Sequence, residues 1–206
     1  MFTGNTQELG TVIRAERGKG LIHLTISAPR TAAQVQRLES VAVNGTCLSV
    51  VSVHRPALAF EIIQETRQLT TLGALRPGDQ VNLEPSLSVS DRLNGHLLFG
   101  HVDGLGTIIK RRHAAGELVL EVRLAAALWR FLVPKGPVAV DGVSLTVGQV
   151  LGRSSFSVHL IPETLRQTTL RSRQVGDPVN IELDYFAKLV SQFLSSRETL
   201  AGRKPH

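Results

Sequence analysis

The segment Val41-Ala-Val-Asn-Gly-Thr-Cys-Leu-Ser-Val50 is written a second time as Val138-Ala-Val-Asp-Gly-Val-Ser-Leu-Thr-Val147. Each copy places an Asn-Gly or Asp-Gly pair between two apolar runs, a pattern typical of a β-hairpin whose turn residues have positive φ. Because side chains alternate along a strand, Cys47 and Ser49 share one face of the second arm, and the second copy repeats this arrangement. The sequence therefore predicts two equivalent hairpins, each presenting a pair of small polar groups.

The repeat extends well beyond the hairpin. The segment 4–12 matches 100–108 at an offset of 96 residues, the hairpin repeats at 97, and the segment 65–84 matches 163–182 at 98. Offsets that grow by one residue at a time indicate single insertions in the loops of a tandem duplication. A period near 100 residues is too long for a solenoid unit and suits two small domains.

The composition is that of an ordinary globular chain, with 206 residues of which 42% are hydrophobic. No apolar run approaches the roughly 20 residues of a membrane-spanning helix, and the start of the chain lacks a signal-peptide pattern. We therefore expect a cytoplasmic protein with no membrane partner. Cys47 is the only cysteine, so it forms no intrachain disulfide and is either a buried small hydrophobe or a functional thiol.

The formal net charge of +6 raises the question of a nucleic-acid partner. The basic residues are scattered, apart from Lys110–His113, which we expect at a loop tip. Aromatic residues are few and do not alternate with Arg and Lys as in a base-stacking surface. We therefore predict that the protein binds no nucleic acid.

Short apolar runs separated by turn residues follow one another at roughly ten-residue spacing in each repeat, as in a small all-β barrel. We expect one short helix within 29–38, and a linker at 85–91 whose apolar residues alternate with serine. The polar pair of each hairpin is expected to face the barrel interior and open a pocket there.

A helix is predicted at the C-terminus. Asp184 is the expected N-cap, and a functional role for this carboxylate is compatible with capping. Apolar residues then recur at the spacing of one helical face: Phe186, Leu189, Val190, Phe193 and Leu194. An exposed stripe of this size is unfavourable in a monomer, so we expect the helix to mediate self-association.

Six segments in this order resemble the alpha-subunit type of riboflavin synthase over nearly the whole chain. They are Met1–Gly4, Val41–Leu48, Gly95–Gly104, Lys135–Gly136, Val140–Thr146 and Ile161–Thr164. The resemblance implies an all-β fold of two tandem six-stranded Greek-key barrels plus a C-terminal α-helix. The expected domains are an N-terminal lumazine-binding barrel at 1–96, a C-terminal one at 97–185, and a trimerisation helix and tail at 186–206.

The resemblance also implies a transferase reaction, the last step of riboflavin biosynthesis. Two molecules of 6,7-dimethyl-8-ribityllumazine dismutate by transfer of a four-carbon unit, giving riboflavin and 5-amino-6-(ribitylamino)uracil. No cofactor and no metal are expected, and the partners are the two lumazines and the other subunits of a homotrimer. The active site is expected between the N-terminal barrel of one subunit and the C-terminal barrel of its neighbour. Whether the protein docks with lumazine synthase is left open.

The resemblance assigns catalytic roles to residues of both repeats. Cys47 would position or activate one lumazine, for which a thiol is a good nucleophile, and His101 would remove a proton from the lumazine C7 methyl group. The repeat places Asn5 at the position equivalent to His101, so the fold itself does not require a histidine there. The remaining residues of this group are Ser40, Ser144, Thr146, Lys135 and Asp184.

Substrate-binding residues fall into two sets, and each set should hold one pterin-like ring largely through backbone groups. The first set surrounds Cys47 and consists of Phe2, Gly4, Asn5, Thr6, Leu48, Ser49, Glu61, Ile62, Ile63, Gln64, Glu65 and Thr66. The second set surrounds Ser144 and consists of Gly100, Val102, Leu145, His159, Leu160, Ile161, Pro162, Glu163 and Thr164.

Two alternatives stay open at this point. His96 and His101 are five residues apart, but no third ligand follows at a metal-site spacing, which argues against a metal site. The chain could instead be a non-catalytic lumazine- or flavin-binding paralogue, a class in which the reactive residues are lost. Both Cys47 and His101 are present, which favours an enzyme.

Overall fold

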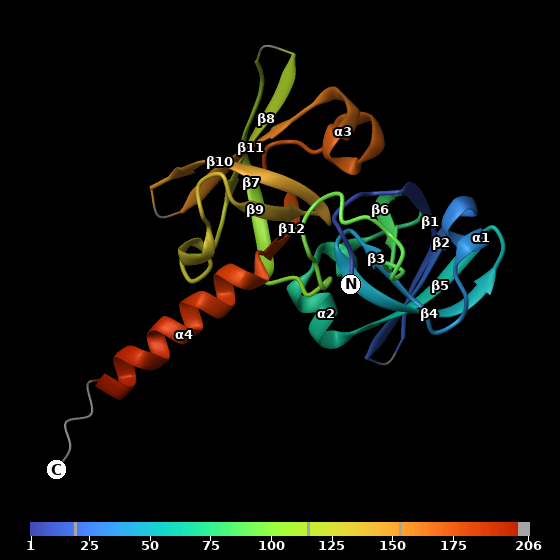
Figure 1. Ribbon diagram of the computed structural model, residues 1–206. Helices are drawn as coiled ribbons and strands as arrows, with labels where there is room; N and C mark the ends of the chain where they lie inside the picture. The colour runs from blue at the N-terminus through green and yellow to red at the C-terminus, as the bar shows by residue number, and fades with distance from the viewer. Residues whose placement is uncertain (19, 115, 153, 202–206) are drawn as a thin grey trace.

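The computed structural model describes residues 1–18, 20–114, 116–152 and 154–201. The chain forms two closed six-stranded barrels that lie side by side, followed by one long helix that points away from both (Figure 1). This architecture confirms the predicted fold class. It also explains the period of the repeat, because each copy of the repeat is one barrel.

The two barrels have the same topology. In the first, the strand order around the barrel is β1-β2-β5-β4-β3-β6, so that β5 lies between β2 and β4 and pairs with both, and β7 to β12 repeat this order. The first barrel consists of β1 (Glu8–Arg17), β2 (Leu21–Ser27), β3 (Ser40–Val43), β4 (Thr46–His54), β5 (Ala57–Ile63) and β6 (Gln80–Pro85). The second consists of β7 (Gly104–Ala114), β8 (Glu117–Arg123), β9 (Pro137–Val140), β10 (Val143–Leu151), β11 (Ser155–Leu160) and β12 (Pro178–Leu183).

Short helical segments fill the connections. The expected helix near Pro29 is present, whereas α2 and α3 fall where the sequence indicated only connections or binding segments. They are α1 (Pro29–Gln34), α2 (Gln64–Leu69), α3 (Pro162–Gln167) and the 3₁₀ turns η1 (Thr71–Ala74), η2 (Trp129–Phe131) and η3 (Thr169–Arg171). The basic run Lys110–His113 lies within β7, so its prediction as a loop tip is wrong. No helix in the described ranges is long and apolar enough to cross a membrane.

Each barrel closes over a core of branched side chains, and this packing explains one repeated motif. A Cβ added at Gly10 would lie 2.6 Å from both Ile26 and Leu83, and one added at Gly106 would lie 2.6 Å from Val122. Real Cβ atoms do not approach so closely, so only glycine fits where the first strand of each barrel crosses its neighbours. The Leu-Gly-Thr sequence, which occurs at 9–11 and again at 105–107, therefore recurs because of barrel packing.

The duplicated hairpins form as predicted. In the β3–β4 turn Asn44 and Gly45 have φ of 45° and 78°, and in the β9–β10 turn Asp141 and Gly142 have φ of 47° and 78°. The two turns also meet, since a Cβ on Gly45 would lie 2.6 Å from the backbone N of Gly142. Glycine is thus needed both for the turn conformation and for the approach of the two barrels.

Buried amide side chains join the barrels around this approach. Asn82 Nδ2 donates to the Asp141 carbonyl at 2.9 Å, and Asn180 Nδ2 donates to the Asn44 carbonyl at 2.8 Å. The Oδ1 atoms of the same two asparagines accept from the backbone of the opposite barrel, at Thr169 and Thr71. The two barrels are therefore fixed relative to one another by reciprocal hydrogen bonds in a buried setting, where an unmade bond is costly.

Candidate functional site

Two glycine-containing segments cross from one barrel to the other. Ser144 N donates to the Gly4 carbonyl at 2.8 Å, and Cys47 N donates to the Gly100 carbonyl at 2.9 Å. Gly4 and Gly100 have φ of 77° and 73°, so both need the conformational freedom of glycine. Each crossing segment thus completes the edge of the hairpin that carries the polar pair of the other barrel.

This exchange corrects the predicted grouping of binding segments. We expected Gly4–Thr6 beside Cys47 and Gly100–Val102 beside Ser144, but the hydrogen bonds place them the other way round. The physical reason is that each segment precedes the first strand of its own barrel and is free to pair with the N–H of the other barrel's hairpin. Periodicity along the chain carries no information about this long-range pairing.

Two equivalent glutamates anchor the crossing segments. Glu84 accepts from Thr3 N at 2.7 Å, from the Thr3 hydroxyl at 2.9 Å and from Gly4 N at 3.0 Å. Glu182 accepts from Phe99 N at 2.8 Å and Gly100 N at 3.1 Å. Burial raises the pKa of both carboxyl groups, and the hydrogen bonds from these N–H groups oppose the rise. Ionised carboxylates are strong acceptors, so these bonds fix the backbone beside Ser144 and Cys47.

Phe2 lies in a small hydrophobic cluster between the barrels and not in a pocket. Its side chain is 1% exposed and belongs to a cluster with Ala42, Leu98 and Ala139, against which Cys47 packs. Phe2 also forms an isolated β-bridge with Leu98. Phe2 therefore holds the crossing segment in place, and a direct contact of its ring with a ligand is not compatible with this burial.

The polar pairs face outward, contrary to the expectation that they line the barrel interior. Along β4 the buried residues are Thr46, Leu48 and Val50, whereas Cys47 is half-buried and Ser49 is exposed. Strand β10 repeats this pattern. Among the described residues the interior of each barrel is filled by apolar side chains, so a ring-sized ligand would have to bind on the outer face of a barrel.

An open cleft of about 730 Å³ lies on the outer face of the second barrel. It contains Lys135, Ser144 and Thr146 from β9–β10 and the connection before it, which were predicted for this site. The other residues that line it are Asn94, Gly95, His96, Glu117, Pro137, Leu145, Gly148, His159, Ile161 and Thr164. A second cleft of about 600 Å³ shares Ser144 and Thr164 with it and adds Gly4–Gln7 from the N-terminus and Glu163 from α3.

His96 lines this cleft and is not among the predicted site residues. Its Nδ1 lies 2.7 Å from Ser144 Oγ, and its Nε2 is buried without a hydrogen-bond partner in the described part of the chain. Burial lowers the pKa of His96, and the nearby Asp184 carboxylate opposes this. A neutral imidazole can either donate to the Ser144 hydroxyl or accept from it through Nδ1, depending on its tautomer. The repeat gave no signal for His96, because its counterpart would precede Met1.

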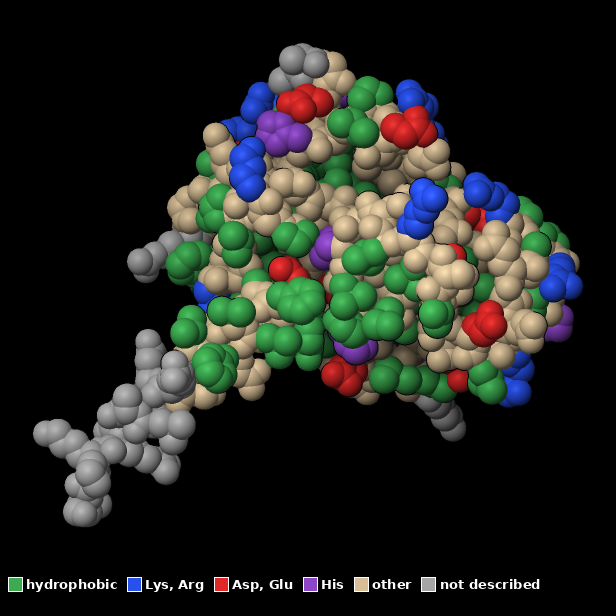
Figure 2. Space-filling view, viewed as in Figure 1, with side chains coloured by type: hydrophobic (Ala, Val, Ile, Leu, Met, Phe, Trp, Pro, Cys, Tyr) green, Lys and Arg blue, Asp and Glu red, His purple; other side chains and the backbone are tan. Residues whose placement is uncertain are grey.

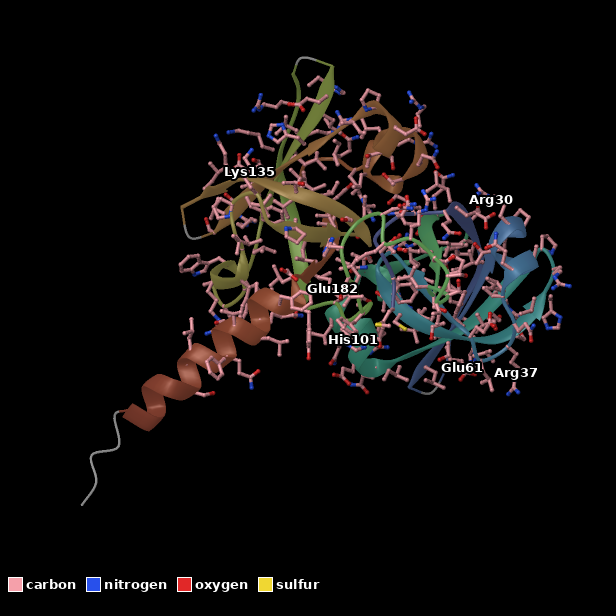
Figure 3. The ribbon with its side chains drawn as sticks, in the orientation of Figure 1. Arg30, Arg37, Glu61, His101, Lys135 and Glu182 are labelled. Carbon is pink, nitrogen blue, oxygen red and sulfur yellow. The ribbon has the colours of Figure 1, made fainter. Side chains whose placement is uncertain are left out.

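The first barrel carries the equivalent positions around Cys47. The repeat places Ser49, Glu61, Ile63 and Thr66 where the second barrel has Thr146, His159, Ile161 and Thr164. His101 is exposed and follows Gly100, whose carbonyl binds Cys47 N. Its ring stacks near that of Phe99, with centroids 6.1 Å apart. In Figure 3 His101 and Lys135 lie well apart, because they belong to the surfaces of different barrels.

The remaining predicted residues divide by exposure. Side chains of several are buried, so these residues can offer a ligand only backbone groups: Thr6, Leu48, Ile62, Leu145 and Leu160. Others are exposed or half-buried on the outer surface: Ser40, Asn5, Gln64, Glu65, Val102, Pro162 and Glu163. Asp184 caps the helix α4 (Tyr185–Ala201) through a hydrogen bond from Phe186 N at 3.1 Å. No group of three or more potential metal ligands lies together within the described residues.

Comparison with known proteins agrees with this geometry. The lumazine-binding domain family matches residues 3–86 and 99–184. Riboflavin synthase of Mycobacterium tuberculosis is 40% identical over 199 residues, covering 95% of this chain and 99% of its own length. The Chlamydia pneumoniae riboflavin synthase is 42% identical over 190 residues and covers 92% of both chains.

Solved structures of LumP have the same fold. Complexes of LumP with 6,7-dimethyl-8-(1'-D-ribityl) lumazine and with riboflavin match with TM-scores of 0.81 and 0.83. Both are 22% identical in sequence and cover 89% of this chain. At this identity the likeness concerns the fold, whereas the curated relatives match at 33% identity and above over nearly the full chain. With two matched lumazine-binding domains and these relatives, the chain belongs to the riboflavin synthase family.

Proposed function

We propose that this protein is a riboflavin synthase that converts two molecules of 6,7-dimethyl-8-ribityllumazine into riboflavin and 5-amino-6-(ribitylamino)uracil. The observation that carries the proposal is the pair of equivalent outward-facing hairpins, each completed by a crossing segment from the other barrel. A reaction between two copies of one substrate needs two similar sites. The duplicated site supplies them, and its two copies differ in the residues that would distinguish donor from acceptor: Cys47 and His101 against Ser144 and Asn5.

The second-barrel cleft offers the groups that an uncharged, polar heterocycle would need. Lys135, Thr146 and the His96–Ser144 pair provide donors and acceptors along one wall. Lys135 can polarise a ring carbonyl because its ammonium is a compact charge with three donors. The backbone of the crossing segment adds N–H and carbonyl groups from Gly4–Thr6 beside Ser144.

The first-barrel site would carry out the proton transfer. His101 is an exposed imidazole that directly follows Gly100, whose carbonyl binds Cys47 N, and it would remove a proton from the C7 methyl group of a bound lumazine. Cys47 would position or activate the ring. Most of the acceleration would come from holding two rings stacked in an attack geometry, which can be worth about 7–11 kcal/mol.

We propose that the two reacting rings are held by sites of different subunits. None of the residues around Cys47 contributes to the walls of the cleft that contains Lys135 and Ser144. A lumazine bound in each site of one chain would therefore lie against different surfaces. Pairing the first-barrel site of one subunit with the second-barrel site of another would bring two rings together, and helix α4 offers a means of holding the subunits.

We expect a homotrimer assembled through α4. Its predicted stripe of Phe186, Leu189, Val190, Phe193 and Leu194 stays between 46% and 62% exposed in the single chain, and Figure 2 shows hydrophobic side chains gathered around the start of the helix. Covering this stripe is favourable because apolar area leaves water. Sedimentation equilibrium at micromolar concentration should give three times the chain mass of 22.3 kDa. Truncation after Tyr185 should give monomers, and a monomeric full-length chain would contradict the prediction.

The activity and the number of sites can be tested together. The pure protein mixed with the lumazine alone should form riboflavin and the diaminouracil in equal amounts. Titration with riboflavin should saturate near two sites per chain with unequal affinities, since the sites differ at Cys47/Ser144 and His101/Asn5. Ligand binding without product formation would instead identify a non-catalytic lumazine-binding protein. Saturation at one ligand per trimer would contradict the duplicated-site argument.

A further inference from the structure

The segment Phe99–Asp103 connects the two barrels and carries His101. Its Gly100 carbonyl accepts from Cys47 N at 2.9 Å, and a Cβ on Gly100 would lie 2.6 Å from Cys47 Cβ. His101 and Cys47 are therefore coupled through a contact with no spare room. A displacement of this segment changes the position of both residues at once.

Residues in the first turn of helix α4 contact both ends of this segment. At one end, Lys188 Nζ donates to both carboxylate oxygens of Asp103, at 2.8 and 2.9 Å, and Leu183 N donates to Asp103 Oδ2 at 2.8 Å. At the other end, the ring of Tyr185 packs against that of Phe99 with centroids 4.9 Å apart. Phe99 in turn stacks near His101. Figure 3 shows Glu182 at the base of α4, on the side of the segment that carries His101.

The equivalent segment of the first repeat has no such contacts with a helix. Gln7 takes the place of Asp103, and the two residues make the same backbone hydrogen bond, from Gln7 N to Leu83 O and from Asp103 N to Ile181 O. After β6 the chain continues into the linker, so the first repeat has no helix in the place of α4. The barrel fold thus does not need the Lys188–Asp103 pair. The additional contacts occur only at the copy of the segment that carries a histidine.

Lys188 also supports the carboxylate that anchors the middle of the segment. Glu182 is buried and accepts from Phe99 N and Gly100 N. Burial raises its pKa, while those two N–H groups and then the Lys188 ammonium oppose the rise; the neighbouring Asp103 adds to it. In the first repeat Glu84 gains the Thr3 hydroxyl as a third donor. Lys188 therefore acts on the segment twice, directly through Asp103 and indirectly by favouring ionised Glu182.

We propose that Lys188 and Asp103 are positioning residues that hold the His101 segment against Cys47, and that helix α4 thereby sets the geometry of the first-barrel site. This inference rests on the proposed function for its consequence in catalysis. The pair is only partly exposed, with side-chain exposures of 23% and 18%, so it holds a fixed geometry better than a solvated surface pair does.

The test compares Lys188→Met, Asp103→Asn and Lys188→Arg in the full-length protein with the lumazine as substrate. A misplacement of about 1 Å can cost as much as 10²-fold in rate, so we expect the first two variants to lose 10- to 100-fold in kcat with a small change in KM. Lys188→Arg should recover most of the rate, because its guanidinium pairs with a carboxylate through two bonds. Arg14→Met is the matched control: it removes the exposed Arg14–Glu16 pair on β1 and should leave kcat unchanged.

A second readout does not depend on activity. The imidazole proton resonances of His101, assigned by their loss in His101→Gln, should shift in Lys188→Met as the ring moves relative to Phe99, and should stay in place in Arg14→Met. Wild-type kcat with unshifted His101 resonances in Lys188→Met would overturn the proposal. A loss of kcat that disappears when the subunit concentration is raised would also overturn it, by assigning the effect to assembly. If the wild type formed no riboflavin, the proposed function would fail. The shift of the His101 resonances would still show whether the Lys188–Asp103 pair holds the His101 segment in place.

Discussion

Replacing His101 by glutamine should lower kcat by about 10²- to 10⁴-fold, the usual contribution of a general acid–base group. Glutamine keeps a polar side chain of similar reach but cannot accept a proton from the C7 methyl group. Because His101 is exposed and the repeat has Asn5 in the equivalent place, the fold should tolerate the change. Thermal unfolding should match that of the wild type, and the deficit should appear in single-turnover riboflavin formation.

Cys47→Ser should reduce turnover by a similar order, and Ser144→Cys is its matched control. Ser144→Cys places the first repeat's residue at the equivalent position of the second repeat, which is half-buried like that of Cys47. It therefore tests whether the thiol is needed in the first barrel specifically. We expect Ser144→Cys to bind the lumazine and Ser144→Cys combined with Cys47→Ser to remain nearly inactive. Near-normal turnover of Cys47→Ser, with unchanged ligand binding and stability, would show that the thiol is dispensable.

Arg173→Leu should destabilise the protein by about 3–5 kcal/mol, the cost of removing one partner from a buried ion pair. The Asp141 carboxylate is fully buried at the contact between the barrels and accepts from Arg173 Nη2 at 2.7 Å and Nε at 3.0 Å. Without the guanidinium it would be left with the hydrogen bond from Asn180 N. Urea unfolding at pH 7 measures this loss directly.

The repeat provides the compensating change. In the first barrel the positions of Asp141 and Arg173 are occupied by Asn44 and Leu75, and Asn44 Oδ1 accepts from Asn82 N as Asp141 Oδ1 does from Asn180 N. Arg173→Leu combined with Asp141→Asn should therefore regain most of the stability. Recovery should be incomplete, because Asn44 Nδ2 is itself buried without a partner among the described residues. A double variant no more stable than Arg173→Leu would contradict this account.

The pH dependence of Arg173→Leu gives an independent check. Burial raises the pKa of Asp141, and Arg173 opposes this in the wild type, so removing Arg173 should raise that pKa further. A folded-state pKa above the unfolded value means that the folded state binds more protons, and stability then falls as pH rises. Relative to the wild type, the stability deficit of Arg173→Leu should shrink as pH falls through the folded pKa of Asp141 in the variant. It should level off below the folded pKa of Asp141 in the wild type, because the unfolded state is common to both proteins.

The sequence by itself determined the elements whose signals are local. The Asn-Gly and Asp-Gly turns predicted the hairpins at Asn44 and Asp141, strand alternation predicted that Cys47 and Ser49 share a face, and the stripe after Asp184 predicted the helix. The repeat predicted two barrels because a duplicated sequence folds twice in the same way. The helices α2 and α3 were missed, since each is six residues long and is held by its place beside a barrel more than by its own propensity.

Only the tertiary structure decided which surfaces form the sites. The period-two pattern separates the two faces of a strand but does not say which face lies inside a closed barrel. Cys47 and Ser144 lie on the outer face because branched apolar side chains fill the interior. The exchange of the segments at Gly4 and Gly100 depends on hydrogen bonds to residues more than forty positions away in sequence. The ion pair between Lys188 and Asp103 joins residues 85 positions apart in sequence. Pairings over such distances depend on how the barrels dock, because their free energy is gained only once both partners are buried together.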